Sequence, residues 1–236
     1  MQHTNMNQPS ANRIVPVVLS LLEVESVADF GCAYGSWLRV WQENGVGEIL
    51  GLDGDYVERD HLQIAQEQFK CFNIAMDLDL ERKFDLVQSL EVAEHIDHGK
   101  AQNFVRNLTR HGSAVLFSSA PPGQGGEWHI NEQPYSYWRD LFAQEGYGLF
   151  DCIRPLIKNA SEIQSWYRYN IFLYVHKDRV ATLPEAVTKF HIPDTAVIPD
   201  VSPPLYKIRK AMVRLLPGSI QNRVAKWRSI QSSRES

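Results

Sequence analysis

The chain lacks a long apolar run, a large excess of charge of one sign and an even set of cysteines. No stretch approaches the roughly 20 apolar residues of a membrane-spanning helix, and residues 1–13 contain no hydrophobic core of a signal peptide. Lys and Arg number 24 against 28 Asp and Glu, so the formal net charge of −4 provides no overall basic field for nucleic acid. These absences favour a cytoplasmic protein.

The cysteines are few and widely spaced. Cys32, Cys71 and Cys152 are odd in number and lie in apolar contexts. This pattern is typical of reduced thiols and not of a disulfide framework or a zinc site. We therefore predict that all three are small core residues.

The length of 236 residues predicts one sizeable domain, over 1–180, and an appendage over 181–236 that begins as a proline-rich linker. Residues 207–228 contain basic and apolar side chains and no acid. Such a basic amphipathic segment could contact an acidic membrane surface, a partner protein or a nucleic acid. The alternative is a helix whose apolar side docks on the domain while its charges face water.

The chain is organised around residues 27–37, where a short apolar run ends in a turn of small residues and a helix follows. The run is typical of a buried parallel strand. The spacing of Gly31, Ala33 and Gly35 allows the backbone to approach a ligand, and the free amides of the next helix can face an anionic group. On this stretch alone, an ordinary tight turn remains the alternative.

A second predicted strand, residues 48–53, ends in Asp53. This acid follows the glycine turn by about twenty residues, the distance at which a βαβ unit brings two strand ends together. A carboxylate there can accept both hydroxyls of a ribose. Asp53 could instead cap a following helix, and Asp55 is a weaker candidate for the ribose.

Strands alternate with helices along the rest of the main domain, which predicts an α/β fold. We expect a Rossmann-like, doubly wound, mostly parallel seven-stranded sheet with an antiparallel edge strand and helices on both faces. Ligands bind beyond the carboxyl ends of such strands. The predicted helices span residues 14–22, 37–44, 57–68, 91–95, 103–110 and 133–145, and the further strands 69–74, 84–90, 113–119, 147–153 and 169–176.

Three pieces of the sequence resemble the class I S-adenosylmethionine-dependent methyltransferases. They are the turn at 29–35, the strand-end Asp53, and residues 84–95, and they occur in that family's order and approximate spacing. The resemblance covers about 27–176. Residues 125–132 and the later Tyr137-Trp138 are similar to a bacterial subgroup from sugar and surface-glycan gene clusters.

The resemblance implies S-adenosyl-L-methionine as cofactor. The turn would hold the methionine end, Asp53 the ribose, and Asn73-Ile74 the adenine. Asn73 stands where the family commonly has an acid, and Asp77 competes for that assignment. The implied cofactor-binding residues are Asp29, Gly31, Cys32, Ala33, Gly35, Trp37, Asp53, Gly54, Asn73, Ile74, Leu90 and Glu91.

Methyl transfer to a hydroxyl needs a base, or a metal that acidifies the hydroxyl. On a helix, Glu91, Glu94 and His95 would share one face, and His129 lies in a later glycine-rich loop. Glu-x-x-Glu-His resembles the metal motif of ubiquinone-pathway O-methyltransferases and small-RNA 2′-O-methyltransferases. We therefore expect His129 and His95 to be catalytic, and Glu91, Glu94, His95 and His129 to form a site for a divalent metal such as Mg²⁺. The alternatives are that Glu94 and His95 only cap and order the helix, and that His129 is a loop histidine hydrogen-bonded to the backbone.

The sequence thus predicts methyl transfer to a hydroxyl of a small molecule, a sugar or surface-glycan precursor, with aromatic side chains around the acceptor. One alternative is a metal-assisted RNA ribose 2′-O-methyltransferase. The balanced net charge makes nucleic acid a less favoured partner. Another is a non-catalytic binding module that acts through its basic C-terminal segment.

Overall fold

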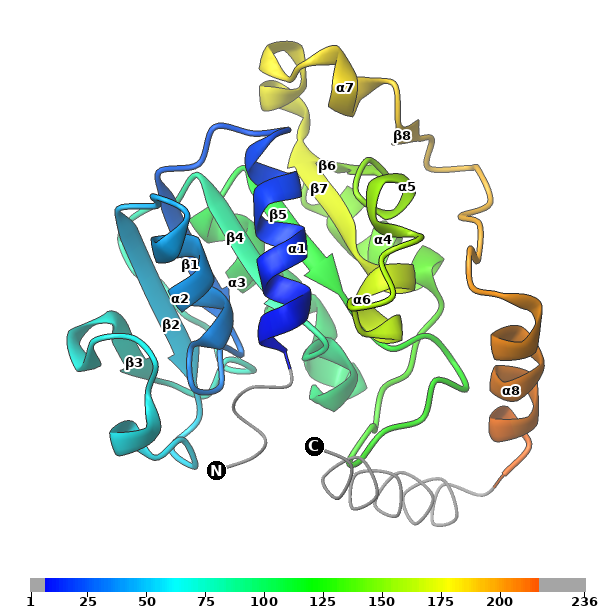
Figure 1. The fold of residues 1–236 in the computed structure, drawn as a ribbon, viewed down its shortest axis with the longest axis horizontal. Coiled ribbons are helices and arrows are strands. Elements are labelled where there is room, and N and C mark those ends of the chain that lie inside the picture. The colour runs from blue at the N-terminus through cyan, green and yellow to red at the C-terminus, as the bar shows by residue number, and fades with distance from the viewer. Residues whose placement is uncertain (1–6, 217–236) are drawn as a thin grey trace.

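The computed structural model describes residues 7–216, and these residues form one mixed sheet with helices on both faces (Figure 1). The strand order is β3-β2-β1-β4-β5-β7-β6-β8. The strands are β1 Ser26–Phe30, β2 Glu48–Asp53, β3 Phe69–Cys71, β4 Leu86–Leu90, β5 Ala114–Ser118, β6 Tyr147–Phe150, β7 Phe172–His176 and β8 His191–Ile192. The α-helices are α1 Gln8–Leu19, α2 Ser36–Glu43, α3 Ala101–His111, α4 Tyr135–Gln144, α5 Arg154–Ile157, α6 Ser165–Asn170, α7 Glu185–Thr188 and α8 Pro204–Arg214.

The sheet confirms the predicted fold class, with two differences in its edge. Strands β3, β2, β1, β4 and β5 are parallel, whereas β7 is antiparallel to both β5 and β6. The antiparallel strand β7 therefore lies inside the sheet, between its neighbours. The two-residue β8 adds an eighth strand beside β6. Strands β4 and β5 are buried along their whole length, as expected for strands covered on both faces.

Two hydrophobic layers cover the sheet (Figure 1). Helices α1, α2, α5 and α6 pack on one face, and α1 buries Ile14, Val15 and Val18 there. Helices α3 and α4 pack on the other, where the Phe142 ring stacks on Tyr174 with a centroid distance of 3.9 Å. The helices leave the carboxyl ends of the parallel strands, at the bottom of Figure 1, to the loops that build the site.

Several local predictions were wrong. The predicted helix at 57–68 is two short 3₁₀ turns, η1 Arg59–His61 and η2 Gln66–Gln68. Its buried residues Val57 and Ile64 share a helical face, but the exposed Asp60 and His61 occupy the positions between them, so there is no continuous apolar stripe. Helix α1 begins at Gln8, before the predicted start at residue 14, with a proline in its first turn.

Two further predictions near the site also need correction. Residues 91–95 are not an α-helix: Glu91 has a φ of 57°, and only the 3₁₀ turn η3, Ala93–His95, follows. Among the cysteines, Cys32 and Cys152 are buried and free, but Cys71 is exposed at the end of the outermost parallel strand. An edge position in a sheet leaves one side of a strand uncovered, so an apolar context in the sequence does not ensure burial.

The segment that follows β7 is more structured than a linker. After the 3₁₀ helix η5, Lys177–Thr182, α7 buries Val187 in the core and β8 joins the sheet. The chain then extends to α8, at the right of Figure 1. The predicted basic segment beyond residue 216 lies outside the described residues. Within residues 7–216, no helix is both long and apolar enough to cross a membrane.

Candidate active site

The turn between β1 and α2 has the backbone geometry that its glycines suggest. Gly31, Ala33 and Gly35 all have positive φ values, of 92°, 47° and 78°. A Cβ atom on Gly31 would lie 2.4 Å from Val92 Cγ2, so only glycine fits against the segment that follows β4. Gly35 is the N-cap of α2 and makes no side-chain cap bond. The turn thus combines close packing with the amides of a helix N-terminus, which suit an anionic group.

Asp29 lies almost fully buried near the end of β1. Gln88 of β4 donates a hydrogen bond from Nε2 to Asp29 Oδ2 at 2.8 Å, and Trp41 of α2 donates to Gln88 Oε1, also at 2.8 Å. Burial raises the pKa of Asp29 to about 7, although the Gln88 bond lowers it, and the nearby Asp53 carboxylate adds to the rise. A buried acid with a shifted pKa at a strand end is typical of a functional site.

The side chain of Asp53, at the end of β2, is hydrogen-bonded to the glycine turn. Its Oδ2 accepts the backbone amide of Ala33 at 2.6 Å, and its Oδ1 accepts the amide of Gly54 at 2.7 Å and the hydroxyl of Tyr56. The proximity of Asp53 to the glycine turn, predicted from spacing, is therefore present. The side chain of Tyr56 is exposed, so a ligand hydroxyl can replace its hydroxyl on the carboxylate.

The third strand end places Asn73 next to Asp53. Cys71 pairs with Asp53 in the parallel register, and the Phe72 amide donates to Asp53 O. Asn73 is exposed just beyond this point, whereas Asp77 forms a surface ion pair with Arg110 at 3.1 Å. The position of Asn73 therefore suits contact with a part of the ligand that extends past Asp53 better than the position of Asp77 does.

Other predicted cofactor residues lie in the packed layer beneath the turn. Cys32, Trp37, Ile74 and Leu90 are buried, and the Trp37 ring contacts the edge of Tyr167 with a centroid distance of 5.1 Å. Side chains in this position shape the floor of a site. We expect Cys32 and Trp37 to meet a ligand through their backbone only, and Gly54 through the amide next to Asp53.

Two buried glutamates lie beyond β4. The amide of Glu91 donates to Ser118 O and Oγ of β5, and its Oε2 accepts from Gln124 at 2.6 Å. Glu94 Oε2 accepts from Ser119 at 3.2 Å, while Glu94 Oε1 is buried without a hydrogen-bond partner. Burial raises the pKa of both carboxyls, and the neighbouring Glu91 raises that of Glu94 further.

The loop at 121–133 places His129 against these carboxylates. Glu132 holds the loop closed: its carboxylate accepts the amides of Gly123 and Gly125, each at 2.7 Å, and His129 Nδ1 at 2.8 Å. His129 Nε2 then points to Glu94 Oε1 at 3.9 Å. The bond to Glu132 fixes the tautomer and leaves Nε2 with the lone pair.

His95 completes a cluster with Glu94 and His129. Its Nδ1 donates to the carbonyl of Trp128 at 3.2 Å, and its ring meets that of His129 at a centroid distance of 5.0 Å. One donor atom from each of these three residues lies within 4.8 Å of the others. Glu91, predicted as a fourth ligand, is outside this group, because it has a left-handed φ just after the end of β4 and its carboxylate bonds to Gln124 instead.

The sequence did not point to Gln88, Gln124 or Tyr56, which contact Asp29, Glu91 and Asp53. A polar residue inside the apolar run of β4 was the available signal for Gln88. Of the aromatic residues expected around an acceptor, Trp138 and Tyr167 are buried, whereas Trp128 is exposed on the loop that carries His129.

Comparison with known proteins identifies the family and the fold. The profile of a family described as "Methyltransferase domain" matches residues 6–151. Among solved structures, magnesium protoporphyrin IX methyltransferase from Synechocystis, with bound S-adenosylmethionine, has a TM-score of 0.55 and 19% identity over 73% of this chain and 80% of that one. The sugar N-methyltransferase KedS8 from Streptoalloteichus has a TM-score of 0.55 and 15% identity over 71% and 87%. DesVI from Streptomyces venezuelae has a TM-score of 0.54 and 14% identity over 73% and 92%. A search of curated proteins gave no match.

The profile covers more than half of the chain, and the chain belongs to this methyltransferase family, of the class I S-adenosylmethionine-dependent type. The likeness to the solved structures, all below 25% identity, concerns the fold.

Proposed function

We propose that the protein transfers a methyl group from S-adenosylmethionine to a hydroxyl of a small molecule of the carbohydrate class. The observation that carries the proposal is the His129–Glu132 pair, which presents a free imidazole nitrogen beside a buried carboxylate, across β4 from the cofactor turn. The similarity to a sugar methyltransferase fold supports the substrate class by analogy.

On the donor side, the amides after Gly31 and at the start of α2 would hold the methionine carboxylate, and Asp29 its ammonium group. Asp53 would accept the two ribose hydroxyls in place of Tyr56. Asn73 would pair with the adenine edge, because its amide offers both a donor and an acceptor. These roles rest on strand ends that lie side by side in β3, β2 and β1.

On the acceptor side, His129 would take the proton. Bound S-adenosylmethionine supplies a methyl group on a sulfonium, which is a good leaving group. The acceptor oxygen would bond to the methyl carbon as the carbon–sulfur bond breaks, the neutral thioether would leave, and His129 Nε2 would take the hydroxyl proton. Glu132 stabilises the imidazolium through Nδ1, since a carboxylate partner favours the charged ring.

The donor side is tested by calorimetric titration with S-adenosylmethionine. Asp53→Asn should weaken binding about 10- to 100-fold, because bonds to a charged acceptor are each worth about 1.5–3 kcal/mol. The matched control is Asp60→Asn, which changes an exposed acid seven residues further along the chain. No binding by the wild type, or equal losses in the two variants, would contradict the proposal.

The acceptor side is tested with radiolabelled cofactor against nucleotide sugars, free glycans and RNA. His129→Gln should lower the methylation rate at least 100-fold without changing cofactor affinity. His61→Gln, an exposed histidine far from the loop in sequence, serves as control. Transfer to RNA alone would replace the carbohydrate assignment by the ribose methyltransferase alternative, and an undiminished rate in His129→Gln would exclude it as base.

A second candidate adds a divalent cation at Glu94, His95 and His129. The donor set fits, because Glu94 Oε1 is buried without a partner and both imidazoles keep Nε2 unprotonated. Two imidazoles and one carboxylate suit Mn²⁺, Fe²⁺ or Zn²⁺ better than Mg²⁺, which prefers oxygen ligands. Such an ion would acidify a bound hydroxyl.

Titration calorimetry with Mn²⁺ and elemental analysis test this site without reference to activity. Glu94→Gln should abolish Mn²⁺ binding, and the matched change Glu58→Gln, at an exposed acid beside a histidine, should not. Absence of a bound metal, together with full activity in chelator, would remove the cation.

A further inference from the structure

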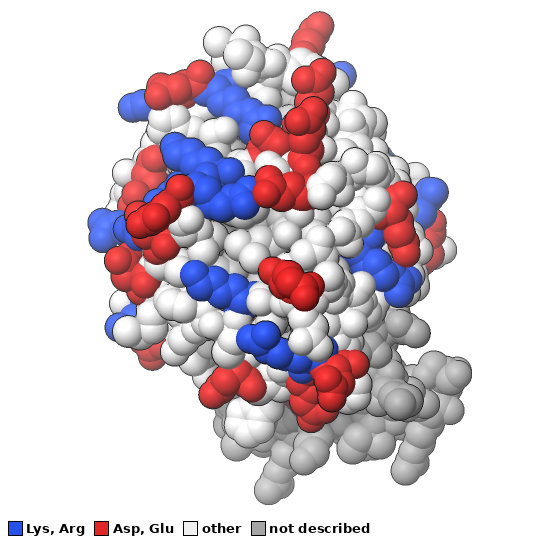
Figure 2. All heavy atoms as spheres, turned by 90° about the vertical axis from the view of Figure 1, so that its left-hand side faces the viewer, with Lys and Arg blue, Asp and Glu red and all other residues white. Residues whose placement is uncertain are grey.

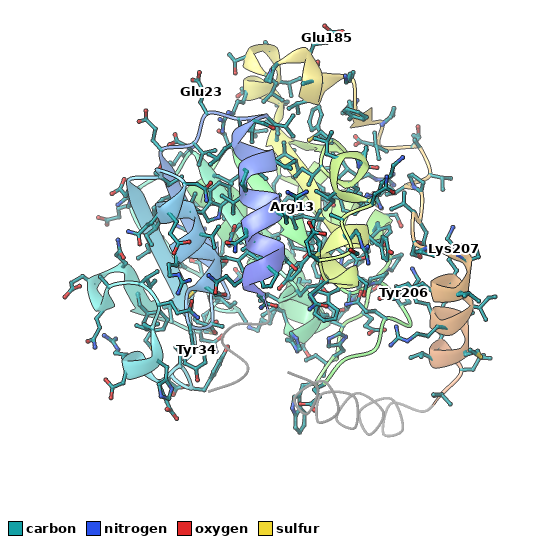
Figure 3. All side chains as sticks on the ribbon, viewed as in Figure 1. Arg13, Glu23, Tyr34, Glu185, Tyr206 and Lys207 are labelled. Atoms are coloured by element: carbon teal, nitrogen blue, oxygen red, sulfur yellow. The ribbon has the colours of Figure 1, made fainter. Side chains whose placement is uncertain are left out.

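Helix α8 is amphipathic, but its polar side faces the domain and its apolar side faces solvent. Its polar face packs on the domain: Lys210 is buried and pairs with Asp200 at 2.6 Å, and Arg209 donates to the Gln124 carbonyl at 3.0 Å. Figure 3 shows Tyr206 on the side of α8 that faces the domain, where its ring meets Tyr169. These contacts attach the helix without using its aliphatic residues.

The aliphatic side chains of α8 face solvent instead. Leu205 is 81% exposed, Ile208 55%, Met212 58% and Leu215, just past the helix end, 85%. At 100° per residue these four positions fall within an arc of about 80°, so they form one continuous stripe, which we call the α8 stripe. Four large apolar side chains in one exposed row are unusual on a monomer surface and mark an interaction site.

The charge around the stripe has a single sign. From residue 201 to residue 234 the sequence has no acid, and its cations are Lys207, Arg209, Lys210, Arg214, Arg223, Lys226, Arg228 and Arg234. Lys207 and Arg214 are exposed on α8 itself. The side of the domain shown in Figure 2 differs, because there acidic and basic residues are interspersed. The apolar stripe therefore lies in the longest acid-free stretch of the sequence, which contains eight cations.

We propose that the α8 stripe and the exposed cations beside it, Lys207 and Arg214, dock the protein on an anionic lipid bilayer. Aliphatic side chains enter the acyl boundary of a bilayer, while lysines and arginines contact lipid phosphates, and the two terms add. The loop that Arg209 contacts also exposes Trp128 and Ile130, whose side chains suit the same interface. Helix α8 is thus a membrane anchor.

Two other occupants fit the stripe less well. A symmetric second copy would bring each patch against itself, so the exposed cations of two copies would meet without compensating acids. A nucleic acid would accept the cations, but Leu205, Ile208 and Met212 offer neither stacking surfaces nor hydrogen bonds to bases.

Co-sedimentation of the full chain with vesicles tests the proposal. Vesicles of equal parts phosphatidylcholine and phosphatidylglycerol should bind the protein at least tenfold more strongly than phosphatidylcholine alone, since each cation near an anionic surface contributes about fivefold. Ile208→Ser/Met212→Ser should lower the partition coefficient at least tenfold. Leu156→Ser/Met76→Ser is the matched control, because those side chains are 56% and 51% exposed elsewhere on the surface.

Charge is tested separately with Lys207→Glu/Arg214→Glu, which should reduce binding to the anionic vesicles and its dependence on salt. The control Lys158→Glu/Lys177→Glu changes two exposed lysines outside α8. It should leave vesicle binding and its dependence on salt unchanged. Thermal unfolding confirms that each variant is folded. Absence of vesicle binding, equal losses in stripe and control variants, or a dimer or RNA complex that the stripe variant alone abolishes would overturn the proposal. None of these readouts depends on methyl transfer.

Discussion

Asp29→Asn should make the stability of the protein less sensitive to pH. In the folded protein the pKa of Asp29 is raised to about 7 from 3.8, chiefly by burial. The folded state therefore holds a proton that the unfolded chain releases above about pH 4. Wherever the folded state binds more protons, stability falls as pH rises, so Asp29 lowers the free energy of unfolding progressively between about pH 4 and pH 7.

The magnitude follows from the size of the pKa shift. A rise of about three units corresponds to about 4 kcal/mol once the pH exceeds both values. Between pH 5 and pH 8 the loss is about 2.5 kcal/mol, because part of it has already occurred at pH 5. Asparagine has the same shape, cannot ionise, and keeps an oxygen that can accept the Gln88 bond. The variant should therefore escape this loss.

Urea unfolding from pH 5 to pH 8 at constant ionic strength measures the effect. The wild type should lose about 2.5 kcal/mol more than Asp29→Asn across this range. The exposed acid Asp60 provides the control, since Asp60→Asn should give a curve parallel to the wild type. Parallel curves for all three proteins would refute the assignment of a raised pKa to Asp29. The same variant should bind S-adenosylmethionine more weakly, so the acid costs stability in exchange for ligand affinity.

Three further substitutions test the packing around the site. Gly31→Ala should destabilise the fold by about 2–4 kcal/mol, because alanine is strained at this left-handed φ and its Cβ clashes with Val92. In a double-mutant cycle, Val92→Ala should recover the part of this loss that the clash causes and not the part caused by backbone strain. Glu132→Gln should lower kcat about 10- to 100-fold with cofactor affinity unchanged, because the loop histidine loses its carboxylate partner. Arg154→Leu should cost about 3–5 kcal/mol by thermal or urea unfolding, since it removes both bonds to the Asp151 carboxylate and the donor to the Pro199 carbonyl, and a smaller loss would show that water reaches these groups.

The cofactor half of the site could be predicted because its signals are local. The β2 strand has its predicted bounds, and its acid lies at the predicted distance from the glycine turn. Apolar runs fix where buried strands end, and parallel strands bring those ends to one edge. Predicting Asp29, Gly31 and Asp53 required only the order of elements along the chain.

The acceptor half could not be predicted in the same way. Its Glu-x-x-Glu-His run has helical spacing, but the positive φ of Glu91 breaks the helix before it starts and separates this residue from His95. The partner of Glu91 is 33 residues away, in another loop. The side of helix α8 that faces the domain could not be predicted from its residue pattern either, because the buried Lys210 salt bridge places its polar side inward.

The two halves of the site differ in how they are held, and this difference locates specificity. Asp29 and Asp53 are fixed by neighbouring strands, so any chain with this sheet can build the donor side. His129 is held by a loop that is supported from within by the Glu132 carboxylate and from outside by two distant groups: the Glu94 carbonyl, which accepts the amides of Ile130 and Asn131, and Arg209 of α8. On the proposed function, a change in any of these supports should alter methyl transfer with cofactor affinity unchanged. We therefore expect acceptor choice to depend on the loop and on its contact with α8, whereas the methyl donor is set by the fold.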